Sequence, residues 1–333
     1  MTTIKGRSAG SIIEGYSIKT AENLIFSVKG VVQPDGCSYA VLRYYPNREG
    51  SRRGYRKLDT LEDSNSLVKA RFPQYMGFDK TLGFEVQRVP FDSIVEVYDP
   101  VQRLDALRGS SRLDSLQRLA VDFSDMLVES SGVPVESVGV TGSMSVGLHN
   151  PSSDLDLIVY GEGSCRMVYD CLPNLFDAAL KGYDIGTISK LYAMRGAPLG
   201  YKLDEFVRAE SRKLLQGIYN SSEFFIRMVR RPREVDDGMF SVSSKRVGGV
   251  RASAVIADDS DSIFTPSVYP LEDVKITDGH VSSLDYALSF RGRFSENAKK
   301  GERVLISGTA EVGANGTVRA VLGNNKSDRL ILI

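Results

Sequence analysis

The chain has 333 residues, 42% apolar and 25% charged, which is typical of a soluble globular protein and long enough for two or three domains. Its 42 basic residues balance its 42 acidic residues, so no overall electric field would draw it to nucleic acid or to a membrane. No apolar run approaches the ~20 residues of a membrane span, and the N-terminus lacks an apolar signal-peptide core, so we expect a cytoplasmic protein. Three scattered cysteines and two histidines favour neither a disulfide framework nor a histidine-based metal site.

The first 100 residues predict a small α+β module. After a loose polar lead-in over residues 1–16, two β-type runs flank a Pro-Asp-Gly turn at residues 34–36, where the glycine can take the positive φ that closes a hairpin. A helix is predicted over residues 61–72 and a further strand over residues 84–89.

A basic loop lies inside this module. Residues 46–57 carry four arginines and a lysine around Tyr55. Such a segment could lie on a phosphate backbone, because basic side chains with an interleaved aromatic are typical of nucleic-acid contacts. It could also be a solvated hairpin loop, which is the interpretation we favour.

A helical segment is predicted over residues 102–130. Apolar side chains recur at steps of three and four along its second half, which indicates one buried helix face. The Gly-Ser-Ser sequence at residues 109–111 divides the segment, Ser111 is the expected N-cap of the second helix, and Gly132 is expected to end it.

Two acidic residues then stand at the start of an apolar strand. Asp154 and Asp156 are two apart, so their side chains share one strand face while Leu155 and Leu157 face the core. Two carboxylates this close repel each other unless a cation lies between them. A hard divalent cation such as Mg²⁺ meets that need, and it normally arrives with substrate phosphates.

The carboxylate pair belongs to an ordered set of features. A short apolar strand precedes Gly142-Ser143, and a polar Asn-Pro-Ser-Ser turn that ends at Ser153 leads into the Asp-x-Asp strand. This arrangement resembles the nucleotidyltransferase superfamily of DNA polymerase beta, which includes poly(A) polymerases, CCA-adding enzymes and antibiotic adenylyltransferases. The resemblance is carried by residues 136–161 and extends less closely to about residue 235. The two ends of the chain resemble an uncharacterised archaeal group of predicted nucleotidyltransferases.

The resemblance implies a role for each motif residue. Gly142 and Ser143 would hold the triphosphate, and Asp154 and Asp156 would hold Mg²⁺, with a two-ion site in an active enzyme. Ser153 and Arg227 complete our set of candidate substrate-binding residues.

The family usually places a third carboxylate on a later strand. Residues 221–238 predict this strand, and the family register puts Phe225 where the carboxylate is expected. Glu223, two residues earlier and on the same face, is our candidate for the missing catalytic acid, and Asp236 and Asp237 are later alternatives.

Between these strands, residues 164–180 and 186–219 predict helices. On a helix beside the carboxylates, Arg208, Arg212 and Lys213 could meet triphosphate, or they could form a solvated face.

The last ninety-odd residues have a different composition. Six short β-type runs are separated by turn residues, with a hairpin signal at Asn315-Gly316, which predicts a small closed barrel or sandwich. Aromatic and cationic residues alternate over residues 286–294, either as an oligonucleotide-binding surface of an OB-like barrel or as ordinary barrel core.

The sequence therefore predicts an α+β fold in three parts. A nucleotidyltransferase core, a mixed sheet with helices over residues 101–237, is flanked by an N-terminal α+β module over residues 1–100 and by an OB-like β-barrel domain over residues 238–333. The predicted reaction is Mg²⁺-dependent transfer of a nucleoside monophosphate from an NTP to an acceptor hydroxyl on RNA or protein. The alternative is a catalytically degenerate scaffold that binds nucleotide or RNA, and Phe225 is the feature in its favour.

Overall fold

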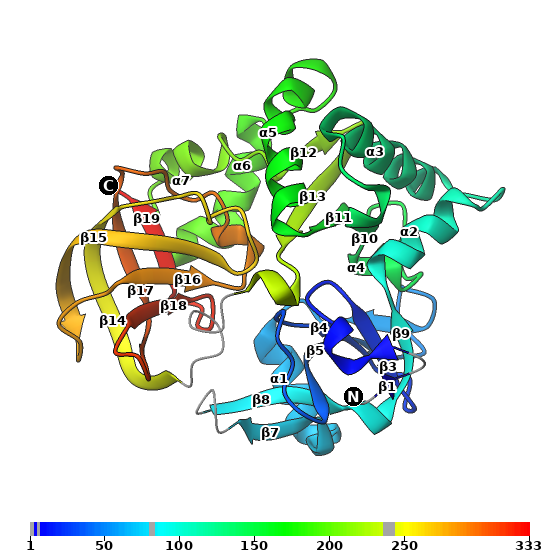
Figure 1. The fold of residues 1–333 in the computed structure, drawn as a ribbon, viewed down its shortest axis with the longest axis horizontal. Helices are drawn as coiled ribbons and strands as arrows, with labels where there is room; N and C mark the ends of the chain where they lie inside the picture. The colour runs from blue at the N-terminus through cyan, green and yellow to red at the C-terminus, as the bar shows by residue number, and fades with distance from the viewer. Residues whose placement is uncertain (1–2, 5–6, 80–83, 236–243) are drawn as a thin grey trace. The chain divides into compact units, whose positions relative to one another are not determined.

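The computed structural model describes residues 3–4, 7–79, 84–235 and 244–333 (Figure 1). The chain divides into two compact units. Unit 1 comprises residues 1–80, 84–170 and 222–236, and unit 2 comprises residues 81–83, 171–221 and 237–333. Sheets and helices occur in both units, which confirms the predicted α+β class.

An antiparallel sheet forms the N-terminal part of unit 1, with strand order β7-β8-β5-β4-β3-β9 and β6 paired to β5 (Figure 1). Its elements are β3 Ser17–Thr20, β4 Ile25–Val28, β5 Cys37–Pro46, β6 Tyr55–Lys57, helix α1 Leu61–Arg71, β7 Met76–Asp79, β8 Phe84–Pro90 and β9 Ile94–Tyr98. The predicted hairpin is β4 and β5, which pair antiparallel. Gly36 takes a φ of +77° in the turn between them, as the Pro-Asp-Gly sequence predicted.

The N-terminal lead-in is better ordered than the sequence predicted. Short strands β1 Thr3–Ile4 and β2 Arg7–Ser8 pair with each other. Ile12 is fully buried in the core of the N-terminal sheet, and Ile13 packs on Ile158 of the central strand described below. The prediction of a loose segment is therefore wrong for its second half, because two adjacent isoleucines can fill two cores at once.

Two helices connect this sheet to the rest of unit 1. They are α2 Pro100–Arg108 and α3 Ser115–Ser131, and Gly132 ends α3 in the left-handed conformation with a φ of +70°. The predicted division at residues 109–111 is correct, but Ser111 is not the cap. Asp114 caps α3 through a capping box with Gln117, because a carboxylate at this position can accept the N–H of the third helical residue.

A mixed sheet follows in unit 1. Strand β10 Val138–Val140 runs antiparallel to β11 Leu155–Tyr160, and β11 runs parallel to β13 Ser222–Val229. The four-residue helix α4 Gly142–Ser145 lies between β10 and β11, and α5 Glu162–Ala178 follows β11. The fully buried side chains of this sheet include Val138, Leu155, Leu157 and Ile226.

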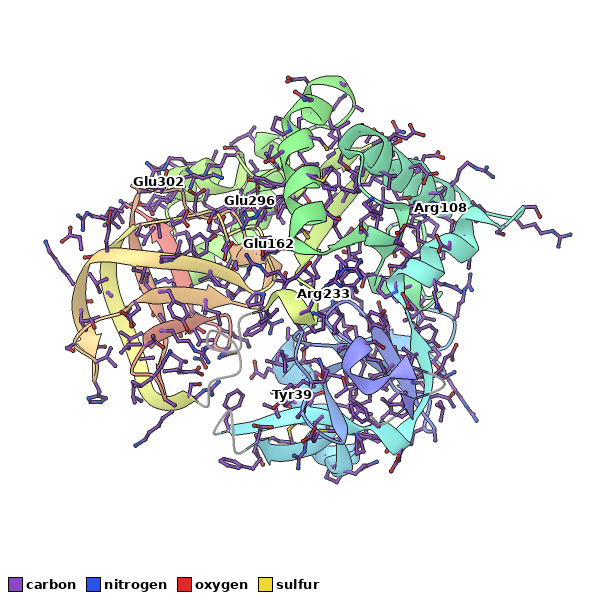
Figure 2. All side chains as sticks on the ribbon, viewed as in Figure 1. Tyr39, Arg108, Glu162, Arg233, Glu296 and Glu302 are labelled. Carbon is purple, nitrogen blue, oxygen red and sulfur yellow. The ribbon has the colours of Figure 1, made fainter. Side chains whose placement is uncertain are left out.

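A set of ion pairs holds the far end of β13 to α5. Glu162 at the start of α5 (labelled in Figure 2) accepts from Arg166 and from Arg230, at 2.7 and 3.0 Å. Hydrogen bonds from Arg230 and Arg166 lower the pKa of Glu162 to about 2.

Unit 2 begins with helical segments that the sequence predicted only in outline. Helix α6 Ile185–Leu191 runs into a π-helical turn at Tyr192–Gly196, and α7 Leu203–Glu210 follows. The prediction of helix up to residue 219 is wrong at its end, where β12 Gln216–Tyr219 forms and Ile218 pairs with Lys181.

Six strands complete unit 2, as the turn spacing predicted. They are β14 Ser244–Ile256, β15 Ser267–Gly279, β16 Tyr286–Ser289, β17 Arg303–Gly313, β18 Val318–Leu322 and β19 Arg329–Leu332. Their order is β14-β15-β16-β18-β17-β19, and β14 also pairs with β17 (Figure 1). The Asn-Gly turn lies between β17 and β18, where Gly316 has a φ of +84°.

Basic residues predicted as triphosphate contacts or as a solvated face have internal partners in unit 2 instead. Arg212 donates to both carboxylate oxygens of Glu302 at 2.7 Å, and the buried Lys213 donates to Glu210 at 2.7 Å. Glu296 and Glu302 are both labelled in Figure 2. These ion pairs fix the end of α7 against the loops of the six-stranded sheet.

Candidate functional site

The two aspartates lie at the start of the central strand of the mixed sheet. Asp154 immediately precedes β11 and is exposed, whereas Asp156 is the second residue of β11 and is half-buried. Leu155 and Leu157 between and beyond them are fully buried. The alternation is the one that the sequence predicted, and it places both carboxylates outside the core.

Gly142 lies against the carboxylate of Asp156. A Cβ atom built on Gly142 would stand 2.1 Å from Oδ2 of Asp156, and the φ of Gly142 is +64°. In addition, the N–H of Thr141 donates to the carbonyl oxygen of Asp156 at 2.8 Å. Only glycine can take this positive φ and also leave room for the carboxylate. The start of α4 therefore lies against the Asp156 carboxylate, and we call this part of the site the corner.

The charge state of Asp156 is strongly perturbed. Burial raises its pKa, the neighbouring Asp154 carboxylate raises it further, and together they outweigh Arg227, Lys57 and Arg43, so that the pKa of Asp156 is about 6. Two neighbouring carboxylates, one of them with a raised pKa, favour a cation bound between them, because the cation would lower the cost of ionising both.

The two serines of the motif have different surroundings. Ser143 is buried in α4, at 8% exposure. Ser153 is buried too, and its hydroxyl accepts from the N–H of Asn150 at 3.0 Å and from Arg52 at 3.2 Å while it donates to Oδ1 of Asn150. Ser153 therefore organises the turn that delivers the Asp-x-Asp strand.

Phe225 stands directly opposite Asp156. The parallel pairing of β11 with β13 sets Asp156 against Phe225 and Ile158 against Arg227. The guanidinium of Arg227 lies 5.6 Å from the centre of the Phe225 ring. The register therefore places an aromatic residue beside Asp156, where the family resemblance called for a carboxylate.

Glu223 lies two residues before Phe225, on β13, and is exposed. Within the residues that the structure describes, no group of three or more His, Cys, Asp or Glu side chains is arranged to hold a metal ion, so Glu223 does not form such a group with Asp154 and Asp156. Asp236 and Asp237 lie outside the described residues.

Cations from the N-terminal sheet reach this corner, which the sequence did not reveal. Arg43 on β5 and Lys57 on β6 both lower the pKa of Asp156. Arg52, between the two strands, donates to the carbonyl of Leu148 at 2.9 Å as well as to Ser153. Arg52 and Lys57 belong to the basic loop for which we favoured a solvated hairpin. That interpretation is wrong for Arg52, whose side chain is bonded to the turn before the Asp-x-Asp strand. The sequence feature that could have indicated these cations was the basic loop itself.

A buried carboxylate was missed in the lead-in. Glu14 is 1% exposed and lies 2.9 Å from Lys29 and 3.5 Å from Arg227. Burial alone would raise its pKa, but Lys29 and Arg227 outweigh burial and hold the pKa of Glu14 below its usual value. Glu14 therefore positions Arg227 on the face of β13 that carries Phe225.

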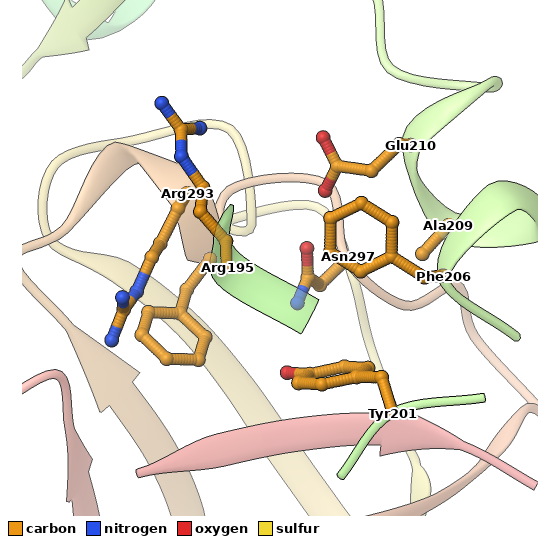
Figure 3. A pocket seen from close by; sticks show the side chains of 8 residues that line it. Arg195, Tyr201, Phe206, Ala209, Glu210, Arg293 and Asn297 are labelled. Carbon is orange, nitrogen blue, oxygen red and sulfur yellow. The ribbon is translucent and has the colours of Figure 1, made fainter. Parts of the chain in front are cut away.

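A separate cavity lies inside unit 2 (Figure 3). At about 30 Å³ it has room for a water molecule and not for a nucleotide. None of the predicted site residues lines it; the lining residues are Arg195, Tyr201, Phe206, Ala209, Glu210, Arg293, Phe294 and Asn297. Phe294 is 1% exposed, so this member of the predicted stacking surface belongs to the core.

Comparison with known proteins agrees with the motif. Residues 122–198 match a protein-family model described as a nucleotidyltransferase domain, which confirms the resemblance. The chain is also 25% identical, over 309 residues, to the uncharacterised protein MJ1086 of Methanocaldococcus jannaschii, an alignment that covers 88% of this chain and 89% of that protein. No solved structure matches the chain. Among the described helices, none combines the length and the apolar character needed to cross a membrane.

Proposed function

We propose that this chain, which contains a nucleotidyltransferase domain over residues 122–198, transfers a nucleoside monophosphate from an NTP to an acceptor hydroxyl and releases pyrophosphate. The observation that carries the proposal is the corner between Gly142 and Asp156. At this corner stands a glycine that no other residue could replace. Beside it are two carboxylates whose mutual repulsion favours a bound cation.

The donor set suits magnesium. Asp154 and Asp156 offer hard carboxylate oxygens, and the raised pKa of Asp156 indicates a carboxylate that is incompletely neutralised by the cations around it. In the proposed site these two residues would hold Mg²⁺, which would supply charge neutralisation on the phosphates. The described residues contain no third acidic ligand in the same group, so the two carboxylates fit one ion better than two.

The other site residues have roles that follow from their positions. The backbone of Gly142 and Ser143 would hold the β- and γ-phosphates at the start of α4. Arg227, held by the buried Glu14, would contribute positive charge from β13. Ser153 would contribute to substrate binding indirectly, because it organises the turn that leads into the Asp-x-Asp strand. Glu223 is proposed as the general base that accepts the acceptor's proton, from a position on the same strand face as Phe225.

A degenerate, non-catalytic scaffold is the second candidate function. The pairing of Phe225 with Asp156 favours it, since an apolar ring occupies the place of an acid. General-base assistance is worth about 10²- to 10⁴-fold in rate. A chain without that base would bind nucleotide and react slowly or not at all.

The acceptor is proposed to be an RNA or a protein hydroxyl, positioned with help from the domains that flank the core. We propose boundaries at residues 100 and 237 and an OB-like barrel for the last domain. The pairing of β14 with both β15 and β17 supports this, since the strand path returns to its starting strand. Small barrels of this class bind oligonucleotides.

A label-transfer assay tests the function. The wild-type chain would be incubated with Mg²⁺, each α-labelled NTP in turn and mixed RNA or protein acceptors. Incorporation that disappears in Asp154→Asn would support the transferase and exclude the scaffold. Nucleotide binding without any incorporation, in the presence of Mg²⁺ and each of the four nucleotides, would favour the scaffold.

A further inference from the structure

The hairpin formed by β5 and β6 is fastened to the Gly-Ser motif by several contacts. Tyr44 of β5 pairs in register with Lys57 of β6, and its buried ring packs on Val146 and Leu148, which follow α4. In the loop that connects the two strands, Arg52 donates to the carbonyl of Leu148. The hairpin is therefore part of the candidate site and not a free surface loop.

Of the cations near Asp156, Lys57 has the weakest partner. Arg43 donates to the carbonyl of Leu58, and Arg227 lies against the buried Glu14. Lys57 lies 3.4 Å from Asp59, a residue whose side chain is 74% exposed. Such exposed pairs contribute little, so the ammonium of Lys57 can exchange this partner at small cost.

The charge balance of the corner indicates what Lys57 would contact. Before metal binding, Arg43, Lys57 and Arg227 offset part of the negative charge of Asp156. A divalent cation on the aspartates would leave Arg43, Lys57 and Arg227 without that counter-charge, at a half-buried place. An anion bound beside these cations would restore the charge balance, and a triphosphate carries enough negative charge to do so.

We propose that Lys57, delivered by the β5–β6 hairpin that Arg52 anchors, binds the triphosphate of the substrate. This deepens the proposed function and rests on it. The phosphate-binding surface is then shared between the motif at Gly142-Ser143 and the N-terminal sheet.

A purely electrostatic role for Lys57 predicts a different response of phosphate binding to substitution. If Lys57 only offsets Asp156, its removal makes the corner more acidic and tightens metal binding, while phosphate binding stays the same. If Lys57 binds phosphate, its removal weakens triphosphate binding even though the metal still binds. Metal alone and triphosphate with metal must therefore be measured separately.

The experiment is calorimetric titration of the full chain with Mn²⁺ alone and with tripolyphosphate in excess Mg²⁺. The variants are Lys57→Met and Lys57→Arg, with Lys57→Gln in reserve should the methionine variant not fold. Lys69→Met is the matched control, because Lys69 belongs to the same N-terminal part and pairs with Glu85 on the surface. Thermal unfolding checks that each variant is folded.

We expect Lys57→Met to weaken tripolyphosphate binding about 10- to 100-fold, as for loss of a charge-assisted hydrogen bond. Binding of Mn²⁺ alone should be unchanged or tighter, Lys57→Arg should stay within about threefold of wild type, and Lys69→Met should match wild type. Wild-type tripolyphosphate affinity in Lys57→Met, or no tripolyphosphate binding by the wild type, would overturn the proposal.

The two proposals fail in different ways. If Asp154→Ala/Asp156→Ala abolishes NTP binding and Lys57→Met does not change it, the role of Lys57 is refuted and the proposed function stands. If tripolyphosphate binding depends on Lys57 but no NTP label is ever transferred, the phosphate site stands and the transferase does not.

Discussion

Gly142 is the residue on which the geometry of the candidate site depends most directly. Its positive φ would strain an alanine by ~1–2 kcal/mol, and a Cβ there would also stand 2.1 Å from the Asp156 carboxylate. Backbone strain and steric overlap are two separate costs, and a second glycine in unit 1 allows them to be told apart.

We therefore predict that Gly142→Ala is more destabilising than Gly132→Ala. Gly132 has a similar φ of +70°, but a Cβ there would meet nothing within 4 Å, so its variant reports the backbone strain alone. Chemical denaturation of both variants measures the difference, which we expect to exceed ~1 kcal/mol. Gly142→Ala should also lose Mn²⁺ binding while Gly132→Ala keeps it. Equal stability and equal metal affinity would show that Asp156 does not lie against Gly142.

The raised pKa of Asp156 predicts how the stability of the folded chain depends on pH. Its folded-state pKa of about 6 lies above the ordinary value of about 3.9, so the folded chain binds more protons than the unfolded chain between these values. This contribution to stability is present below pH ~4, is lost as the pH rises toward about 6, and does not change further above it.

Two measurements follow from this titration. Metal must displace the proton, so Mn²⁺ affinity should fall about tenfold per pH unit below pH 6 and should level off above it. Asp156→Asn removes the half-buried charge and should raise the melting temperature at pH 7.5 while it abolishes metal binding. A melting temperature lower than that of wild type, or a metal affinity independent of pH between 5 and 7, would contradict the assigned environment of Asp156.

At the scale of elements, strand β13 decides whether the corner has a third acid. Its register sets Phe225 opposite Asp156, and neither the aromatic ring nor Arg227 beside it can ligate a metal. The site therefore offers an experiment in gain of function, in which the missing carboxylate is supplied.

We predict that Phe225→Asp tightens Mn²⁺ binding by roughly tenfold or more, because metal affinity rises with the number of charged ligands. Phe225→Asn is the matched control, since it removes the same ring without adding charge. Isothermal titration of both variants distinguishes them. Should the two variants bind Mn²⁺ equally, position 225 would lie beyond reach of the metal held by Asp154 and Asp156.

Secondary structure in this chain could be predicted where local chemistry determines it. The Pro-Asp-Gly and Asn-Gly hairpins, the division between α2 and α3, and the alternation around Asp156 all follow from short-range rules and are all present. The cap of α3 was misplaced by three residues because Ser111 and Asp114 are both acceptable caps, and only the hydrogen bond to Gln117 distinguishes them.

Contacts between distant parts of the chain could not be predicted in this way. Lys57 and Asp156 are ninety-nine positions apart, and no periodicity in either segment indicates that the charge of one acts on the other. The same holds for Glu14 and Arg227, where a carboxylate in an unremarkable lead-in fixes a cation of the site. The motif predicted the acidic side of the corner, while its cationic side depends on tertiary packing.

On the scale of the whole molecule, the chain divides into two compact units. Within unit 2, Glu296 is 1% exposed and accepts the backbone N–H groups of Leu214 and Leu215, at 2.9 and 3.0 Å. It ties the segment after α7 to the six-stranded sheet. The residues of the candidate corner all belong to unit 1.

We predict that Glu296→Gln destabilises the protein by about 1–3 kcal/mol, because the amide can no longer accept both N–H groups. Mg²⁺-NTP affinity, measured well below the unfolding temperature, should remain unchanged. Glu272→Gln, at an exposed position on β15, is the control for loss of one negative charge and should have little effect. A loss of nucleotide affinity in Glu296→Gln would show that unit 2 takes part in binding.

Binding of Mg²⁺-NTP to the full chain, compared between wild type and Asp154→Ala/Asp156→Ala by isothermal titration at pH 7.5, tests the central claim most directly. The account predicts saturable binding by the wild type that requires Mg²⁺ and that disappears in the folded double variant. Equal binding by the double variant would contradict the assignment of the site to the corner formed by Gly142, Asp154 and Asp156.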